Sequence, residues 1–258
     1  MSAPLTLRAL ARYALAGLPL GFVGLPLYVH LPKFYADHLP LSLAYIGFAL
    51  FAARIIDCFL DPFIGYWADT SRGSRRKRMV TSYVTLAAGI IILFYLPEWS
   101  TEQNALILLC LALIFTYISY SVVMIHYYAA GLSLSRDYHQ NTRISAWREG
   151  AILVGVLIAS VVPIWLSNQL GDSKLGYLYF AWIFAFLVGA ILFLLPRESK
   201  SKASKVDFSW RILFQSQQMR WTFALFFLNA LPTSICATLF LFFVDDIIRV
   251  PDYGGFFL

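Results

Sequence analysis

Residues 42–67 read SLAYIGFALFAARIIDCFLDPFIGYW, an apolar stretch that is long enough to cross a bilayer. Three charged side chains, Arg54, Asp57 and Asp61, lie in its middle. In a helix, steps of about 100° per residue place all three within about 60° of one another on one face. A charge at mid-membrane costs about 2.5–3.5 kcal/mol or more, so such residues usually face a polar interior and mark an ion or solute pathway. The stretch therefore predicts a membrane transporter with a coupling-ion site on its second helix.

The rest of the chain is similarly apolar. Hydrophobic residues make up 60% and charged residues 13% of the sequence, against about 45–50% and 25% in soluble domains. The apolar residues form blocks of about twenty, the length that a transmembrane helix needs. We therefore expect an all-α polytopic membrane protein with spans at residues 7–31, 42–68, 79–96, 104–132, 144–166, 175–195 and 221–244.

A polar segment rich in Ser and Lys, residues 197–215, separates the sixth span from the seventh. We interpret it as a linker on the cytoplasmic side, between a six-helix unit at residues 1–196 and a second unit at residues 216–258. The chain stops where another helix is starting, and we therefore expect it to be a truncated piece of a longer protein.

The basic residues gather in alternate connections, and this pattern predicts the topology. Connections rich in Lys and Arg lie on the cytoplasmic side, so the N-terminus is expected there too, in a multi-pass protein of the inner (plasma) membrane. Topology then accounts for the formal charge of +6, and we expect lipid contact but no nucleic-acid partner. The sequence does not predict an oligomeric state. The basic connections are at residues 8–12, 71–78, 136–143 and 197–211.

The pattern R-x-x-D-x-x-x-D-P-x-x-G at residues 54–65, followed by a basic turn, resembles helix two of the glycoside–pentoside–hexuronide:cation symporters. The melibiose permeases are the type members of that family, which belongs to the major facilitator superfamily. Residues 137–149 resemble the family's loop between helices four and five, and residues 250–255 resemble its lead-in to helix eight. The resemblance implies an N-terminal six-helix bundle of the major facilitator type plus the first helix of a second bundle.

The same resemblance implies a cation site made of Asp57, Asp61 and a hydroxyl on helix four at Ser121. Na⁺ suits this set because hard cations prefer oxygen ligands. With H⁺ the two carboxylates would share one proton, because neighbouring carboxylates resist double ionisation. Arg54 would offset the negative charge when no cation is bound. The choice between Na⁺ and H⁺ stays open, and no other cofactor is expected.

On the solute side, this sequence departs from the melibiose permeases. The two positions that carry sugar-binding acids there align with Gly21 and Met124 here, so a melibiose-type galactoside is not expected. A more apolar cavity would suit another glycoside, a hexuronide or an amphiphile such as a lysolipid. The candidate solute contacts are Met124, His126, Tyr127, Tyr128 and Arg148.

The turn after the second span resembles the superfamily's helix two–three motif, in which a carboxylate at a helix end pairs with loop arginines at the cytoplasmic gate. The residues concerned are Asp69, Arg72, Arg75 and Arg76. Topology signalling alone is the alternative for the arginines.

Each functional assignment has a structural alternative. The Arg54, Asp57 and Asp61 group could be an ion-pair network that only holds helices together. His126 could simply hydrogen-bond a neighbouring helix, and Arg148 could pair with Glu149 at a gate or extend toward the interface.

No nucleotide-binding or hydrolase spacing, such as G-x-x-x-x-G-K-[ST], H-E-x-x-H or G-x-S-x-G, occurs in the chain. We therefore expect a cation-coupled symporter of a sugar-like or glycoside-like solute, and no enzyme. A carrier of an amphiphilic, lipid-like solute and a non-transporting membrane scaffold remain the alternatives.

Overall fold

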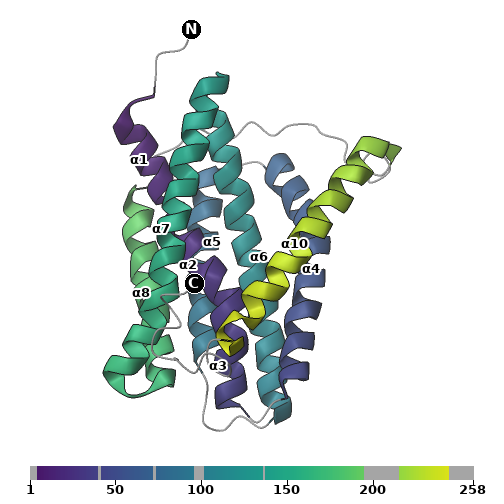
Figure 1. The fold of residues 1–258 in the computed structure, drawn as a ribbon. Coiled ribbons are helices and arrows are strands. Elements are labelled where there is room, and N and C mark those ends of the chain that lie inside the picture. The colour runs from purple at the N-terminus through teal and green to yellow at the C-terminus, as the bar shows by residue number, and fades with distance from the viewer. Residues whose placement is uncertain are drawn as a thin grey trace.

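The computed structural model describes residues 5–39, 42–71, 74–95, 102–135, 137–194 and 215–243. All regular secondary structure in these ranges is helical, which confirms the predicted all-α class (Figure 1). Six segments of the described chain are long and apolar enough to cross a membrane, the first of them Leu7–His38. The helices are α1 (Leu7–Leu15), α2 (Leu18–Leu25), η1 (Pro26–His30), α3 (Leu31–His38), α4 (Leu43–Thr70), α5 (Arg75–Phe94), α6 (Glu102–Leu134), α7 (Tyr138–Leu170), α8 (Ser173–Leu194) and α10 (Gln217–Phe243).

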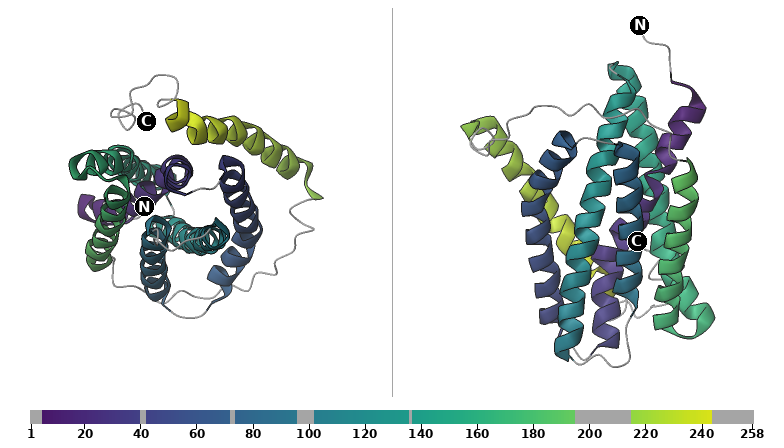
Figure 2. Two further views of the ribbon diagram at one scale, coloured as in Figure 1. Left: turned by 90° about the horizontal axis from the view of Figure 1, so that it is seen from below. Right: turned by 180° about the vertical axis from the view of Figure 1, so that it is seen from behind.

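The long helices run alternately up and down in one bundle (Figure 1). The start of α1 lies at the same end as the last turns of α4 and α6 and the first turns of α5 and α7; we call this the N-terminal end of the bundle. Helix α10 covers residues 221–243 of the predicted seventh span, but it is not among the six membrane-crossing segments of the described chain. It crosses the bundle obliquely, in contact with η1 and α3. Seen from below, it lies at the edge of the bundle (Figure 2).

The first span is longer than predicted. We expected it to end at residue 31, but its helices continue to His38. Pro32 does not end it, because proline is tolerated in the first turn of a helix, and here it opens α3. Lys33 and Asp37, expected in a connection, therefore lie in this helix and form an i,i+4 ion pair at 3.3 Å.

Helix α7 also starts earlier than predicted. It begins at Tyr138 and not at residue 144, because the side chain of Asp137 caps it by accepting a hydrogen bond from Gln140 N at 3.0 Å. Most of the segment at residues 137–149, expected as a loop, is therefore helical. Arg148 and Glu149 lie about three turns inside α7.

Helix α5 likewise begins at Arg75, with Ser74 as its cap, four residues before the predicted start. The basic residues 75–78 thus form the first turn of a helix. The other boundaries agree with the predicted ones to within four residues.

The backbones of α2 and α7 touch at two glycines. A Cβ atom added to Gly21 would lie 1.9 Å from the carbonyl oxygen of Ile152, and one added to Gly155 would lie 2.2 Å from that of Leu18. Small residues allow this close approach of membrane helices. Gly21, which we had aligned with a sugar-binding acid, is therefore a packing position at which no side chain fits.

Several predictions fall outside the described residues. These are the linker at residues 197–215 except its last residue, the lead-in at residues 250–255, the gate residue Arg72 and the side chain of Arg75.

Candidate functional site

The charged residues of α4 meet α6 at Asp57. The Arg54 Nη1 atom donates to Asp57 Oδ2 at 2.9 Å, and the Ser121 hydroxyl donates to Asp57 Oδ1 at 3.0 Å. Both carboxylate oxygens of Asp57 are therefore bonded, and the residue is 5% exposed. The structure thus brings together Arg54, Asp57 and Ser121, which come from two different spans.

A cavity of about 420 Å³ opens beside this group. Asp61 reaches it from one turn further along α4, and its Oδ1 atom is buried without a hydrogen-bond partner among the described residues. The described residues include no group of three or more His, Cys, Asp or Glu side chains that could hold a metal. A cation in this cavity would therefore depend on neutral oxygens as well as on the two carboxylates. The lining residues are Tyr28, Arg54, Asp57, Cys58, Asp61, Tyr120, Ser121, Met124 and Ile125.

Two tyrosine rings hold the guanidinium of Arg54. Its Cζ atom lies 4.7 Å from the ring centroid of Tyr28 and 4.8 Å from that of Tyr117, within the range of a cation–π contact. The rings come from η1 and α6, so Arg54 joins three segments of the bundle.

Arg54 and Tyr28 also line a second cavity, of about 480 Å³, which α10 helps to enclose. The two cavities therefore share one wall. The second cavity is lined by Leu27, Tyr28, Gly47, Leu50, Phe51, Arg54, Tyr117, Ser234, Ile235 and Leu239.

Tyr117 and Tyr120 were not predicted as site residues, although their spacing in the sequence of α6 indicates that they share a helix face with Ser121. Tyr117, Tyr120, Ser121 and Met124 follow the i, i+3, i+4, i+7 spacing of a single helix face. Three of them line the cavity beside Asp57, and Tyr117 contacts Arg54.

His126 lies elsewhere, near the N-terminal end of the bundle. Its Nε2 atom accepts a hydrogen bond from Arg78 Nε at 2.9 Å, and its Nδ1 atom lies 2.8 Å from the carbonyl oxygen of Val122. The ring of Trp67 packs edge-on against it at 5.9 Å. Since Nε2 accepts, Nδ1 carries the proton and donates to Val122. His126 thus connects α6 with α4 and α5.

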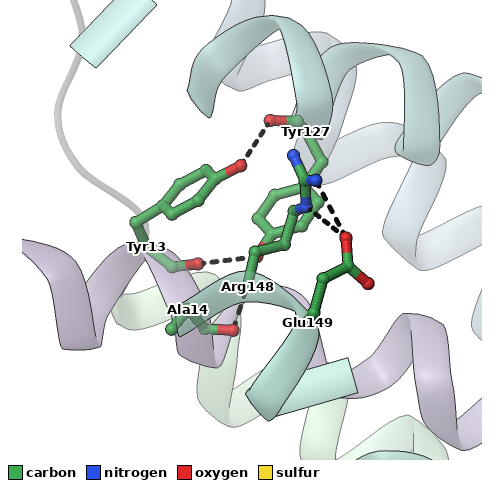
Figure 3. Close-up of polar contacts among 5 residues, drawn as sticks. All are labelled: Tyr13, Ala14, Tyr127, Arg148 and Glu149. Atoms are coloured by element: carbon green, nitrogen blue, oxygen red, sulfur yellow. Dashed lines mark hydrogen bonds and ion pairs between the residues drawn. The ribbon is translucent and has the colours of Figure 1, made fainter. Parts of the chain in front are cut away.

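Tyr127 of α6 and Tyr13 of α1 hydrogen-bond each other in both directions (Figure 3). Its hydroxyl donates to the carbonyl of Tyr13 at 3.1 Å, the Tyr13 hydroxyl donates to the carbonyl of Tyr127 at 3.3 Å, and the two rings stack at 4.7 Å. Beside them, Arg148 donates through Nε and Nη2 to Glu149 Oε1 at 3.0 and 2.8 Å. The guanidinium of Arg148 lies 3.9 Å from the ring centroid of Tyr128.

The structure therefore does not gather the proposed solute contacts of α6 in one place. Of Met124, His126, Tyr127 and Tyr128, the cavity beside Asp57 includes Met124 alone. The physical reason is the helix itself, because steps of about 100° per residue turn consecutive side chains toward different neighbours. Solute contact by His126, Tyr127, Tyr128 or Arg148 stays a prediction.

At the predicted gate, Asp69 is exposed in the last turn of α4. Arg76 is half-buried in the first turn of α5, and its Nε atom is buried without a hydrogen-bond partner in the described part of the chain. Their gating role stays a prediction as well.

Comparison with known proteins identifies the family. Residues 12–258 match the family model described as MFS/sugar transport protein. The match covers almost the whole chain.

Three curated relatives from bacteria show what the chain is similar to. It is 27% identical over 177 residues to the putative sulfoquinovose importer of Escherichia coli K12, covering 65% of this chain and 36% of the relative. It is 25% identical over 235 residues to the inner membrane symporter YicJ of the same strain, covering 87% and 51%. It is 25% identical over 192 residues to the isoprimeverose transporter of Lactiplantibacillus pentosus, covering 69% and 38%. The matched regions thus span about a third to a half of these relatives.

Proposed function

The chain belongs to the MFS/sugar transport protein family, and on that premise we propose that it takes part in cation-coupled symport of a sugar-like or glycoside-like solute. Two of the relatives are named for sugars, sulfoquinovose and isoprimeverose, and a third is named a symporter. The proposal extends these names to a chain that spans only part of their length. It places the N-terminus in the cytoplasm and the protein in the inner membrane, in keeping with the positions of the basic connections.

The observation that carries the proposal is the arrangement around Asp57. This buried carboxylate is neutralised by Arg54 and bonded by Ser121, and Asp61 lies in the same cavity. A buried carboxylate needs a positive partner, because an uncompensated buried charge is strongly destabilising. A cation entering the cavity supplies that charge and competes with Arg54 for Asp57. The coupling cation, Na⁺ or H⁺, therefore binds at Asp57 and Asp61 with Ser121 as a third oxygen.

Arg54 links cation binding to solute binding, because it lines both cavities. When the cation takes its place at Asp57, the guanidinium is still held by the rings of Tyr28 and Tyr117. Arg54 and Tyr28 also form part of the wall of the second cavity. Displacement of Arg54 from Asp57 therefore changes the surface that a solute meets in that cavity.

The lining of the second cavity favours one alternative solute class. Most of its side chains are apolar, among them Leu27, Leu50, Phe51, Ile235 and Leu239. An amphiphilic solute, with a polar end at Arg54 and an apolar part against these residues, is the second candidate.

Cys58 offers a direct test of the cation site, because it lines the same cavity as Asp57 and is exposed. In a Cys110→Ala/Cys236→Ala background at one fixed pH, we expect Na⁺ to slow the reaction of Cys58 with a thiol reagent, relative to choline at equal ionic strength. Asp57→Asn should abolish this protection. A labelling rate that does not depend on Na⁺, together with a pH dependence that is the same in Asp57→Asn as in the parent, would contradict the proposal and favour a non-transporting scaffold.

A further inference from the structure

A proline interrupts the backbone hydrogen bonds of α4 next to the cation site. Pro62 lies inside this helix, four residues after Cys58. Proline has no backbone N–H, so the carbonyl oxygen of Cys58 lacks the donor that it would have in a regular helix. The helix nevertheless continues from Leu43 to Thr70. It therefore carries an acceptor without its helical partner between Asp57 and Asp61.

The same situation occurs in α7, where the protein supplies a replacement donor. Pro163 removes the helical partner of the Ala159 carbonyl, and the buried His30 lies with its Nε2 atom 3.1 Å from that oxygen. Buried carbonyl groups are almost always paired, which explains why a side chain takes over there. For the Cys58 carbonyl, no side chain in the described part of the chain acts as a substitute donor.

The position of Cys58 indicates what its carbonyl can bind. Cys58 lines the 420 Å³ cavity together with Asp57, Asp61 and Ser121. Asp61 Oδ1 is buried there without a hydrogen-bond partner among the described residues. A second acceptor near Asp61 would increase the repulsion between lone pairs unless a positive group lies between them. An acceptor-rich cavity of this kind fits a cation.

The side chains alone give an incomplete ligand set. Two carboxylates and one hydroxyl provide few groups, whereas hard metal cations typically take about six or more oxygen ligands, backbone carbonyls among them. In membrane transporters, carbonyl groups freed by irregular helices coordinate Na⁺.

We propose that the carbonyl oxygen of Cys58, freed by Pro62, is a ligand of the coupling cation when that cation is Na⁺. This inference rests on the proposed cation site at Asp57 and Asp61. Pro62 acts through the backbone and is a positioning residue, because its own side chain is not a ligand.

The test compares two replacements at position 62 that both remove the proline ring. Pro62→Ala restores the N–H, which then bonds the Cys58 carbonyl and withdraws it from the cation. Replacement of Pro62 by lactic acid, which puts an ester oxygen in place of the N–H, leaves the carbonyl free. Calorimetric titration of the 258-residue chain in detergent micelles with NaCl measures the Kd for Na⁺. We expect Pro62→Ala to raise this Kd about tenfold or more, as loss of a group supporting a metal site typically does, and the ester variant to stay within about twofold of the parent.

Two further variants complete the design. Pro163→Ala makes the same change in α7, away from the cavity, and should leave the Kd for Na⁺ unchanged. Pro62→Gly also restores the N–H and replaces Pro62→Ala if the alanine variant does not give folded protein, as judged by circular dichroism.

The outcomes separate this inference from the proposed function. If the alanine and ester variants weaken Na⁺ binding equally, the effect comes from loss of the Pro62 ring, and the carbonyl of Cys58 is not a ligand. Unchanged Kd values in both would overturn it as well. If the parent chain and Asp57→Asn respond identically to Na⁺, the cation site itself is wrong, whatever the result at Pro62.

Discussion

Arg54 and Asp57 form an ion pair within one helix in which the two partners differ sharply in burial. Their side chains meet at 2.9 Å, with 40% of the Arg54 side chain and 6% of the Asp57 side chain exposed. The buried partner has the greater need for the pair, because a carboxylate out of water costs free energy unless a positive group compensates it.

Removal of the guanidinium should make stability depend on the cation. We expect Arg54→Gln to lower the free energy of unfolding without Na⁺ by about 1–3 kcal/mol, less than for a fully buried pair because Arg54 is partly in contact with solvent. Saturating Na⁺ should recover most of this loss. Thermal unfolding in NaCl and in choline chloride measures both effects. Lys33→Gln, which breaks the more exposed pair with Asp37, is the matched control, and an equal dependence on Na⁺ in both variants would contradict the prediction.

The hydroxyl of Ser121 should contribute to cation affinity. Ser121→Ala removes both a donor to Asp57 and a neutral oxygen from the cavity, so we expect the Kd for Na⁺ to rise about tenfold, as for hydrogen bonds to charged groups. Ser119→Ala on the same helix is the control, because Ser119 bonds only the backbone of its own helix in the contacts described, at Phe115. Equal affinities of the two variants would rule out a role for Ser121.

The contact between α2 and α7 should not tolerate a methyl group. Gly21→Ala would place its Cβ atom within 1.9 Å of a backbone oxygen, which cannot move aside as a flexible side chain can. We expect a loss of about 2–3 kcal/mol, the upper range for overpacking. Gly150→Ala, where the added atom meets nothing within 4 Å, should be neutral or stabilise α7 by about 0.5–1 kcal/mol. Thermal melts of the two variants in the same detergent provide the comparison, and similar melting temperatures would contradict the packing argument.

His30 and Pro163 should show strong coupling. His30→Leu leaves the carbonyl of Ala159 and the hydroxyl of Tyr177 without their present bonds to the imidazole, and we expect it to cost about 2–4 kcal/mol. In that background, Pro163→Ala restores a helical donor to Ala159 and should recover about 1 kcal/mol. A double-mutant cycle on unfolding free energies measures the coupling. Additive effects would show that the imidazole does not replace the missing helical bond.

The structure also shows which parts of the site could be predicted from the sequence. Arg54, Asp57 and Asp61 share a helix, so their common face follows from the helical period alone. Tyr28 and His126 could not be placed in this way, because their partners come from other helices and depend on how those helices pack. The start of α7 was missed for a local reason: its first two turns are polar and resemble a loop, although Asp137 is a typical cap residue.

The segment η1, Pro26–His30, is a turn of π-helix between α2 and α3, and this has a practical consequence for protein engineering. A π-turn contains about one residue more per turn than an α-turn, which rotates everything after it by about 100° relative to an uninterrupted α-helix. One helical wheel drawn for residues 7–38 would therefore assign the wrong faces to α3, although it would describe α2, which precedes η1. Designs that alter the lipid-facing surface of this span, or that fuse a rigid helix to it, have to count residues separately on the two sides of η1.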